Sequence, residues 1–145
     1  MGFTSTGLAQ RYDVKRYSVN EGMPSGQVYD IEFDENGFAW FATAYGVVRT
    51  DGINFFTIGE EQGLKEETIN NLFIDSEGNF WVASIENGVS LIQGDTAVYL
   101  EDLNFLNSKD VNYIVESSPG KLWFGTNDSG IYLWDRTTNK IDSLN

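Results

Sequence analysis

The stretch DENGFAW at Asp34–Trp40 returns twice further along the chain, and this repetition decides the fold. The second copy is DSEGNFW at Asp75–Trp81, and the third is SSPGKLW at Ser117–Trp123. The tryptophans step by 41 and then 42 residues, and a glycine three residues before each one keeps the same step. Tandem units of about 40–45 residues are typical of β-propeller blades, which have four strands each. The expected structural repeat residues are Gly37, Trp40, Gly46, Gly78, Trp81, Gly88, Gly120, Trp123 and Gly130.

Short runs rich in Val, Ile, Phe, Tyr and Trp surround each copy, which predicts β-strands. Asn36-Gly37 and Glu77-Gly78 are hairpin-turn dipeptides, because glycine adopts a positive φ without strain at Cβ. No stretch has the 3.6-residue period of an amphipathic helix. The predicted strands are Val28–Phe33, Phe38–Thr43, Gly46–Thr50, Ile53–Ile58, Ile69–Ile74, Phe80–Ser84, Gly88–Ile92, Ala97–Leu100, Val111–Glu116, Leu122–Thr126, Gly130–Trp134 and Lys140–Leu144.

The sequence therefore predicts an all-β chain, a β-propeller fragment of about three four-stranded antiparallel blades plus one extra N-terminal outer strand. The extra strand is expected at Tyr12–Tyr17, which aligns with the fourth strand of the first blade. First strands such as LFI at Leu72–Ile74 are apolar on both faces, which favours a position between neighbouring blades. The expected division is 1–11 as a flexible N-terminus or cloning remnant, 12–27 as the outer strand and a loop, and 28–58, 59–100 and 101–145 as the three blades.

Composition excludes several classes of function. The chain has 145 residues, and its 9 Lys+Arg against 22 Asp+Glu give a formal charge of −13. This charge argues against binding to nucleic acid or to an anionic membrane surface. The absence of His and Cys excludes thiol chemistry and Ser-His-Asp triads. We expect no cofactor, and we expect membrane contact only through segments absent from this chain, since no apolar run approaches ~20 residues and no signal peptide is recognisable.

The repeat G-L-x(4–5)-V-x-x-I-x-x-D-x-x-G-x-x-W-x-x-T-x-x-G-V resembles the two-component regulator propeller repeat. The first copy, at Tyr17–Gly52, fits best, and the second, at Glu60–Ile92, fits well. The third copy departs from the pattern, because Phe105 replaces the loop glycine and Ser117 replaces the turn aspartate. The resemblance covers about Tyr12 to Asn145, and the chain resembles a fragment from the start of a longer propeller.

This resemblance implies a non-catalytic, ligand-sensing module of a bacterial hybrid histidine kinase. It also implies a periplasmic location and an extracellular carbohydrate as the ligand. The alternative is a propeller that serves as a protein–protein interaction scaffold and binds no small molecule.

A ligand site is expected on one rim, where the links between second and third strands meet the longer loops between blades. Sequence varies in these loops while the strand columns repeat, and loops on a rigid scaffold commonly carry function. A rim that is merely solvated is the open alternative. The expected ligand-binding residues are Tyr45, Glu86, Asn87, Asn127, Asp128, Ser25, Gln27, Glu66 and Lys109.

Three features allow a functional as well as a structural interpretation: the turn aspartates, the repeated tryptophans and the carboxylates. Asp34 and Asp75 could indicate a metal site. Aspartate at this place in a turn, however, commonly accepts hydrogen bonds from the turn backbone, and a Ca²⁺ site needs more converging oxygens than one turn offers. Tryptophan faces suit sugar rings, but their strict place after each turn favours packing between blades. Paired carboxylates hydrolyse glycosides without histidine. Here, however, the turn pattern differs from that of sialidase propellers and the arginines are scattered, so we expect no enzyme and no metal.

Three blades do not close a ring, so the first and last blades are expected to expose an apolar sheet face. Two copies together supply six blades, within the usual four to eight. We therefore expect a homodimer that closes a six-bladed ring, with Tyr12–Tyr17 pairing beside the partner's last strand. An open monomer is the alternative.

Overall fold

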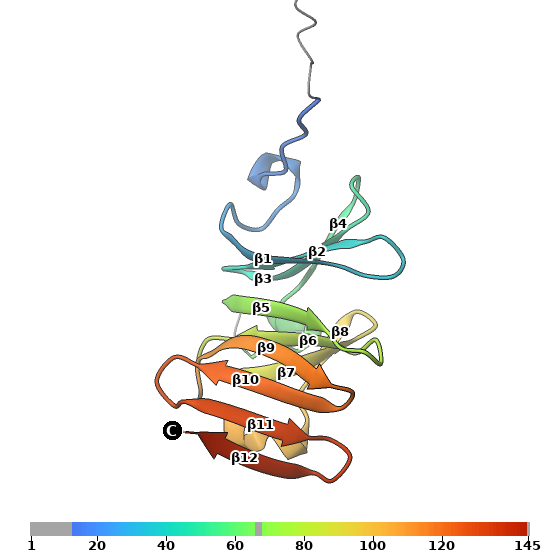
Figure 1. Cartoon of the computed structure of the whole chain (residues 1–145). Helices are drawn as coiled ribbons and strands as arrows, with labels where there is room; N and C mark the ends of the chain where they lie inside the picture. Colours follow the sequence, from blue (N-terminus) through green and yellow to red (C-terminus); the bar gives the residue numbers. More distant parts are fainter. Residues whose placement is uncertain (1–12, 66–67, 145) are drawn as a thin grey trace, which may run out of the picture.

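The computed structural model describes residues 13–65 and 68–144 of the chain. Within these residues, the strands form three separate four-stranded antiparallel sheets that follow one another in chain order (Figure 1). Blade 1 contains β1 (Val28–Phe33), β2 (Ala39–Thr43), β3 (Gly46–Thr50) and β4 (Phe55–Ile58). Blade 2 contains β5 (Ile69–Ile74), β6 (Phe80–Ser84), β7 (Gly88–Gln93) and β8 (Thr96–Val98). Blade 3 contains β9 (Val111–Ser118), β10 (Lys121–Thr126), β11 (Ile131–Asp135) and β12 (Lys140–Leu144).

The predicted all-β fold with three four-stranded antiparallel blades is confirmed. Several strands, β1 and β5 among them, begin and end at the predicted residues. A clear difference is β4, which begins at Phe55 instead of Ile53. The Asp51 carboxylate accepts hydrogen bonds from the N–H groups of Ile53 and Asn54, at 2.9 and 2.7 Å, so these residues belong to a turn.

The predicted extra outer strand at the N-terminus is wrong for the residues that the structure describes. Residues 13–18 form no strand, and Tyr12 lies outside the described residues. A strand requires a neighbouring ladder, whereas this segment contacts blade 1 through side chains: the ring of Tyr17 lies 5.7 Å from that of Phe55. The backbone then turns into the short 3-10 helix η1 (Val19–Glu21), which a capping box of Ser18 and Glu21 holds.

The core consists of two apolar layers, one on each side of blade 2. Strand β6 contributes to both, because successive side chains of a strand point to opposite faces. Phe80 and Val82 belong to the cluster shared with blade 1, while Trp81 and Ala83 belong to the cluster shared with blade 3. Trp81 is 0% exposed. The prediction that the repeated tryptophans pack between blades is therefore confirmed for Trp40 and Trp81.

Two short 3-10 helices lie in the connections between blades, η2 (Glu60–Gln62) and η3 (Glu101–Leu106). The connection between blades 2 and 3 contributes to the core as well as to the surface, because Leu103 and Leu106 of η3 are buried in the cluster between these blades. Among the helices in the described part of the chain, none has the length and apolar character to cross a membrane.

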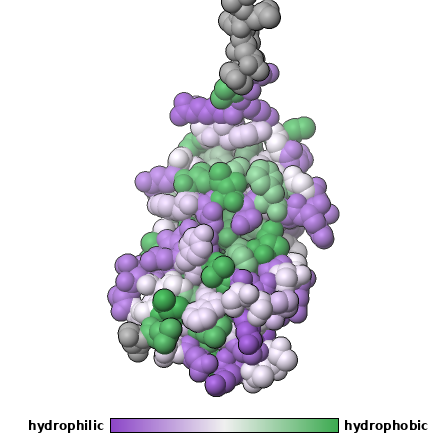
Figure 2. All heavy atoms as spheres, in the orientation of Figure 1, coloured by the Kyte–Doolittle hydropathy of each residue, from purple (hydrophilic) through white to green (hydrophobic). Residues whose placement is uncertain are grey.

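Blades 1 and 3 each leave one sheet face uncovered. Phe33 on β1 is 66% exposed and Tyr113 on β9 is 63% exposed. The expectation that first strands are buried on both faces therefore fails for β1 and β9, because no blade covers their outer faces among the residues that the structure describes. Figure 2 shows apolar side chains exposed between polar margins on the face in view.

Candidate functional site

The loops that were expected to share a rim do meet at one end of the blades. The N–H of Ile85 in the β6–β7 turn donates to the carbonyl of Thr68 at 3.1 Å. The N–H of Gly88 donates to the carbonyl of Lys109 at 3.0 Å, and the N–H of Asn127 donates to the carbonyl of Asp110 at 3.0 Å. The turns between second and third strands of blades 2 and 3 are thus fixed against connections between blades. We call this end the rim. The opposite end carries the hairpins between the first and second strands and between the third and fourth strands of each blade, and we call it the turn end.

Glycine at the start of the third strand of blades 1 and 2 permits close approach of the neighbouring backbone. A Cβ atom on Gly88 would lie 2.5 Å from the carbonyl oxygen of Leu106. On Gly46 it would lie 2.4 Å from the carbonyl oxygen of Ile58. Both distances are far shorter than a van der Waals contact, so the repeat needs glycine here to bring the rim loops together.

The predicted rim residues differ in how far they reach solvent. Tyr45 is 58% exposed, while Ser25 is 7% exposed and its hydroxyl accepts the N–H of Gln27 at 3.0 Å. Ser25 therefore holds its own loop and presents little to a ligand. Glu66 lies outside the described residues. The remaining predicted residues divide into the exposed Gln27, Glu86, Asn127 and Asp128 and the half-buried Asn87 and Lys109.

The structure gathers two of these predicted residues around one shallow pocket in blade 3. Asp128, Ser129, Gly130 and Tyr132 line a pocket of about 430 Å³. The ammonium of Lys109 lies 5.5 Å from the centre of the Tyr132 ring, a cation–π arrangement. The hydroxyl of Ser129 donates to the Asp128 carboxylate at 3.1 Å. Sequence reasoning missed Tyr132, which stands at the rim end of β11, within a strand rather than a loop.

A polar column along the inner strands was also missed. Asp30, Asn71 and Tyr113 occupy the same position in the three copies. The side-chain amide of Asn71 donates to the Asp30 carboxylate at 2.6 Å, and its carbonyl oxygen accepts the N–H of Ile114 at 2.9 Å. Asp30 also accepts the N–H of Leu72 at 2.9 Å. These bonds join each blade to the next, so this column is structural in blades 1 and 2.

The turn aspartates have a structural role that exceeds the expected one. Asp75 Oδ1 accepts the N–H groups of Glu77 and Asn79, at 3.0 and 2.8 Å, as predicted for a turn. In addition, Asp75 Oδ2 accepts the indole N–H of Trp81 at 2.8 Å. Burial opposes ionisation of Asp75, but the hydrogen bonds from Trp81 and Asn79 outweigh it, so the pKa of this carboxyl lies below its ordinary value.

No metal centre is built by the described residues, which contain no group of three or more carboxylate side chains able to share an ion. Asp34 uses its carboxylate as Asp75 does: it accepts the N–H groups of Asn36 and Phe38 and the indole N–H of Trp40, at 2.9, 3.0 and 2.8 Å. The oxygens of both turn aspartates therefore serve the turn and the tryptophan that follows it.

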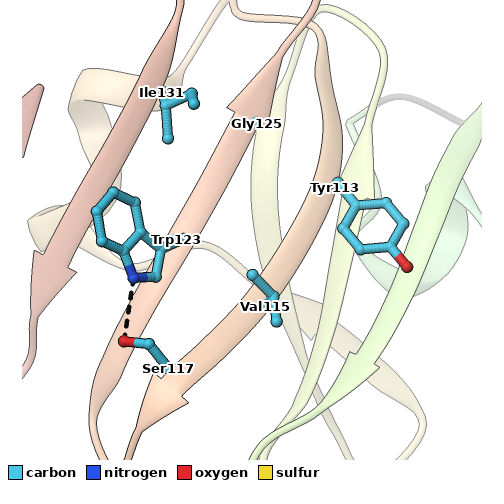
Figure 3. A pocket seen from close by; sticks show the side chains of 6 residues that line it. All are labelled: Tyr113, Val115, Ser117, Trp123, Gly125 and Ile131. Atoms are coloured by element: carbon cyan, nitrogen blue, oxygen red, sulfur yellow. Dashed lines mark hydrogen bonds between the residues drawn. The ribbon is translucent and has the colours of Figure 1, made fainter. Parts of the chain in front are cut away.

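The uncovered face of blade 3 carries a second kind of hollow. Tyr113, Val115, Trp123 and Ile131 line an apolar depression of about 450 Å³ on this sheet. Figure 3 shows Val115, Trp123 and Ile131 on the same face, with the Trp123 indole bonded to the hydroxyl of Ser117 at 3.0 Å. Trp123 occupies the register of Trp40 and Trp81, which pack on the following blade, so this depression has the character of an unpacked blade interface.

Comparison with known families identifies the repeat itself. The model of the two component regulator propeller matches residues 63–86 and 106–128. The resemblance stated from the sequence is thereby confirmed for these two segments. The expected ranking of the copies is wrong, because the matched segments fall in the second and third copies and not in the first. The third copy keeps its Gly120 turn and Trp123 despite its altered loop and turn residues.

Solved structures support the fold. The extracellular domain of the hybrid two component system BT4673 from B. thetaiotaomicron matches with a TM-score of 0.69 and 19% sequence identity, over 90% of this chain and 18% of that one. The extracellular domain of BT3049, another hybrid two component system of B. thetaiotaomicron, matches with a TM-score of 0.53 and 15% identity, over 90% of this chain and 26% of that one. The chain thus spans about a fifth to a quarter of the length of these domains. No curated protein matches the chain in sequence.

Proposed function

We propose that the chain is a non-catalytic, ligand-sensing part of a periplasmic sensor propeller in a bacterial hybrid two-component regulator. The observation that carries this proposal is the presence of two-component regulator propeller repeats in two consecutive stacked blades. The structural neighbours are extracellular domains of such systems, which supports a location outside the cytoplasm.

The proposed ligand is an extracellular carbohydrate bound at the rim. The exposed ring of Tyr45 offers an apolar face, which suits the C–H groups of a sugar ring. Around the blade 3 pocket, Asp128 and Ser129 offer hydrogen-bonding oxygens, and Lys109 offers an ammonium donor. This mixture of aromatic faces and uncrowded polar groups fits a polyhydroxy ligand better than an apolar one.

A thermal-shift screen across oligosaccharides tests this proposal. A ligand that binds only the folded chain raises its apparent melting temperature. A sugar that raises the melting temperature of the parent chain should no longer do so with the variants Tyr45→Ala or Lys109→Ala. Ile53→Ala, an exposed apolar change at the turn end, serves as the matched control and should keep it. If no sugar in a broad panel raises the melting temperature, the result contradicts sugar binding and favours the alternative of a protein–protein interaction scaffold.

We also propose that two copies of this chain associate through the uncovered sheet faces of blades 1 and 3. Inside the chain, the face that carries Trp40 packs on blade 2, and the face that carries Trp81 packs on blade 3. The equivalent Trp123 face of one copy would therefore receive the uncovered blade 1 face of the other. This head-to-tail contact, made twice, gives a six-bladed ring and covers Phe33 and Tyr113.

A further inference from the structure

The two interfaces between blades differ at the turn end. Between blades 2 and 3, the guanidinium of Arg136 bridges Asp75 and Glu77, with Nη1 at 3.3 and 2.9 Å from their carboxylate oxygens. The same guanidinium lies 5.7 Å from the ring centre of Trp81 and 5.9 Å from that of Trp134. An arginine thus fills this interface, held by a turn carboxylate and by tryptophan.

Strand register identifies the equivalent position between blades 1 and 2. Trp134 pairs with Leu122 just as Ile92 pairs with Phe80. Arg136 stands two residues after Trp134, and Gly94 stands two residues after Ile92. The interface between blades 1 and 2 therefore has a glycine where the next interface has its arginine.

The space left by this difference is a pocket of about 340 Å³. Its wall from blade 1 contains Asp34, Glu35 and Asn36 of the β1–β2 turn, and its wall from blade 2 contains Gly94. Trp40 and Phe80 line it as well, with their ring centres 4.5 Å apart. Both blades that form the pocket are present in this chain, so it does not depend on what covers the outer faces.

The charge around this pocket is negative, although the guanidinium of Arg49 lies 5.3 Å from the ring centre of Trp40. Arg49 also lines the pocket, but its guanidinium pairs with the Asp95 carboxylate at 2.9 Å, so these two charges cancel. Asp34, Glu35 and Arg49, the charged residues that line the pocket, sum to −1, and Asp95 beside it brings the local charge to −2. Among the described residues, no cation pairs with Asp34, whereas its equivalent Asp75 pairs with Arg136.

We propose that this pocket binds a guanidinium group, such as the arginine side chain of a peptide. Between blades 1 and 2, the bound guanidinium takes the place that Arg136 occupies between blades 2 and 3. It donates to Asp34 Oδ2, which already accepts the Trp40 indole N–H, and to Glu35. Guanidinium is planar and weakly hydrated, so it suits the narrow space beside Trp40 and Phe80 better than an ammonium does. The pocket lies at the end opposite the rim, so it is distinct from the proposed carbohydrate site.

Titration followed by NMR tests this proposal on the whole chain. The probe is N-acetyl-arginine amide, with N-acetyl-citrulline amide as its uncharged isostere. Arginine amide should shift the Trp40 indole N–H and Gly94 amide signals in a saturable manner, and citrulline amide should not. Asp34→Asn removes the charge, leaves one oxygen to serve either the turn or the indole, and should weaken binding about tenfold. Glu35→Gln, an exposed change that leaves the fold intact, should weaken it less.

Asp128→Asn is the matched control, since it removes the same charge at the rim and should leave arginine binding unchanged. The absence of a saturable shift, equal binding of citrulline amide, or binding unaffected by both Asp34→Asn and Glu35→Gln would overturn the proposal. A Gly-Arg-Gly peptide and agmatine distinguish the source: tighter binding of the peptide supports a protein partner, and tighter binding of agmatine supports a small guanidino compound.

Discussion

The indole of Trp81 donates a hydrogen bond to Asp75 at 2.8 Å, and Trp40 makes the same bond to Asp34 at the same distance. Each pair is six residues apart, across one hairpin. The aspartate that closes the turn therefore also orients the tryptophan that packs on the next blade. In the third copy, Ser117 takes over as acceptor for Trp123 at 3.0 Å, so the relationship survives the change of residue.

Replacing Trp81 by alanine should destabilise the chain strongly. The side chain is 0% exposed and lies between blades 2 and 3, where its ring meets that of Trp134 at 6.1 Å. Removing a buried aromatic costs about 3–5 kcal/mol. Urea denaturation measures the loss. An unchanged midpoint would show that Trp81 has no packing role between the blades.

Acid should weaken the chain partly through Asp75. Its pKa is lowered in the folded state, so ionised Asp75 stabilises the fold at pH values above the ordinary pKa of 3.8. This contribution is lost as pH falls through the lowered value. At neutral pH, Asp75→Asn should be less stable than the parent chain, and the difference should shrink below about pH 4. A difference that stays constant down to pH 2 would contradict this role.

The bonds of Asn71 should be needed to hold the blades in register. Asn71→Leu leaves the N–H of Ile114 without its acceptor and removes the amide that donates to Asp30, which keeps only the N–H of Leu72 across this interface, at a cost of about 1–3 kcal/mol. Asn112→Leu, an exposed change on the neighbouring inner strand, is the control and should cost much less. Hydrogen exchange at Ile114 provides the local readout, and unchanged protection in Asn71→Leu would be the contrary result.

Changes on the rim should separate binding from folding. Tyr45→Ala and Asn127→Ala should alter the unfolding free energy by less than about 0.5 kcal/mol, as exposed substitutions usually do. The same variants should weaken any sugar that the thermal-shift screen finds. A large loss of stability on Tyr45→Ala would instead assign this ring to the fold.

Local patterns made the strands and turns predictable. Alternating apolar residues and turn glycines located β1 and β5 to the residue, because these signals act within a few positions of the sequence. The bond between Asn71 and Asp30 was not predictable in this way, since it joins residues 41 positions apart. The same holds for Arg136 and Asp75, which are 61 positions apart. Such contacts depend on how whole blades are placed, which periodicity alone does not describe.

The candidate sites were likewise predictable where local sequence signals define them, and not where they depend on contacts between blades. Loop variability predicted a rim site that includes Lys109 and Asp128, but Tyr132 was hidden because it lies on the same face of β11 as buried Trp134 and therefore looks like a packing residue. The pocket at Gly94 was equally hidden. It is recognised only when the register of two blades is compared, because a glycine in a hairpin looks like ordinary turn chemistry.

The solution mass of the chain tests most directly whether both outer sheet faces are unpacked blade interfaces. Light scattering across a range of concentrations should give twice the 16.3 kDa of one chain. High salt should favour this dimer, since salt screens the repulsion between chains of charge −13. A stable, well-behaved mass of 16.3 kDa at all concentrations would contradict the account, because the faces of Phe33 and Tyr113 would then remain in water.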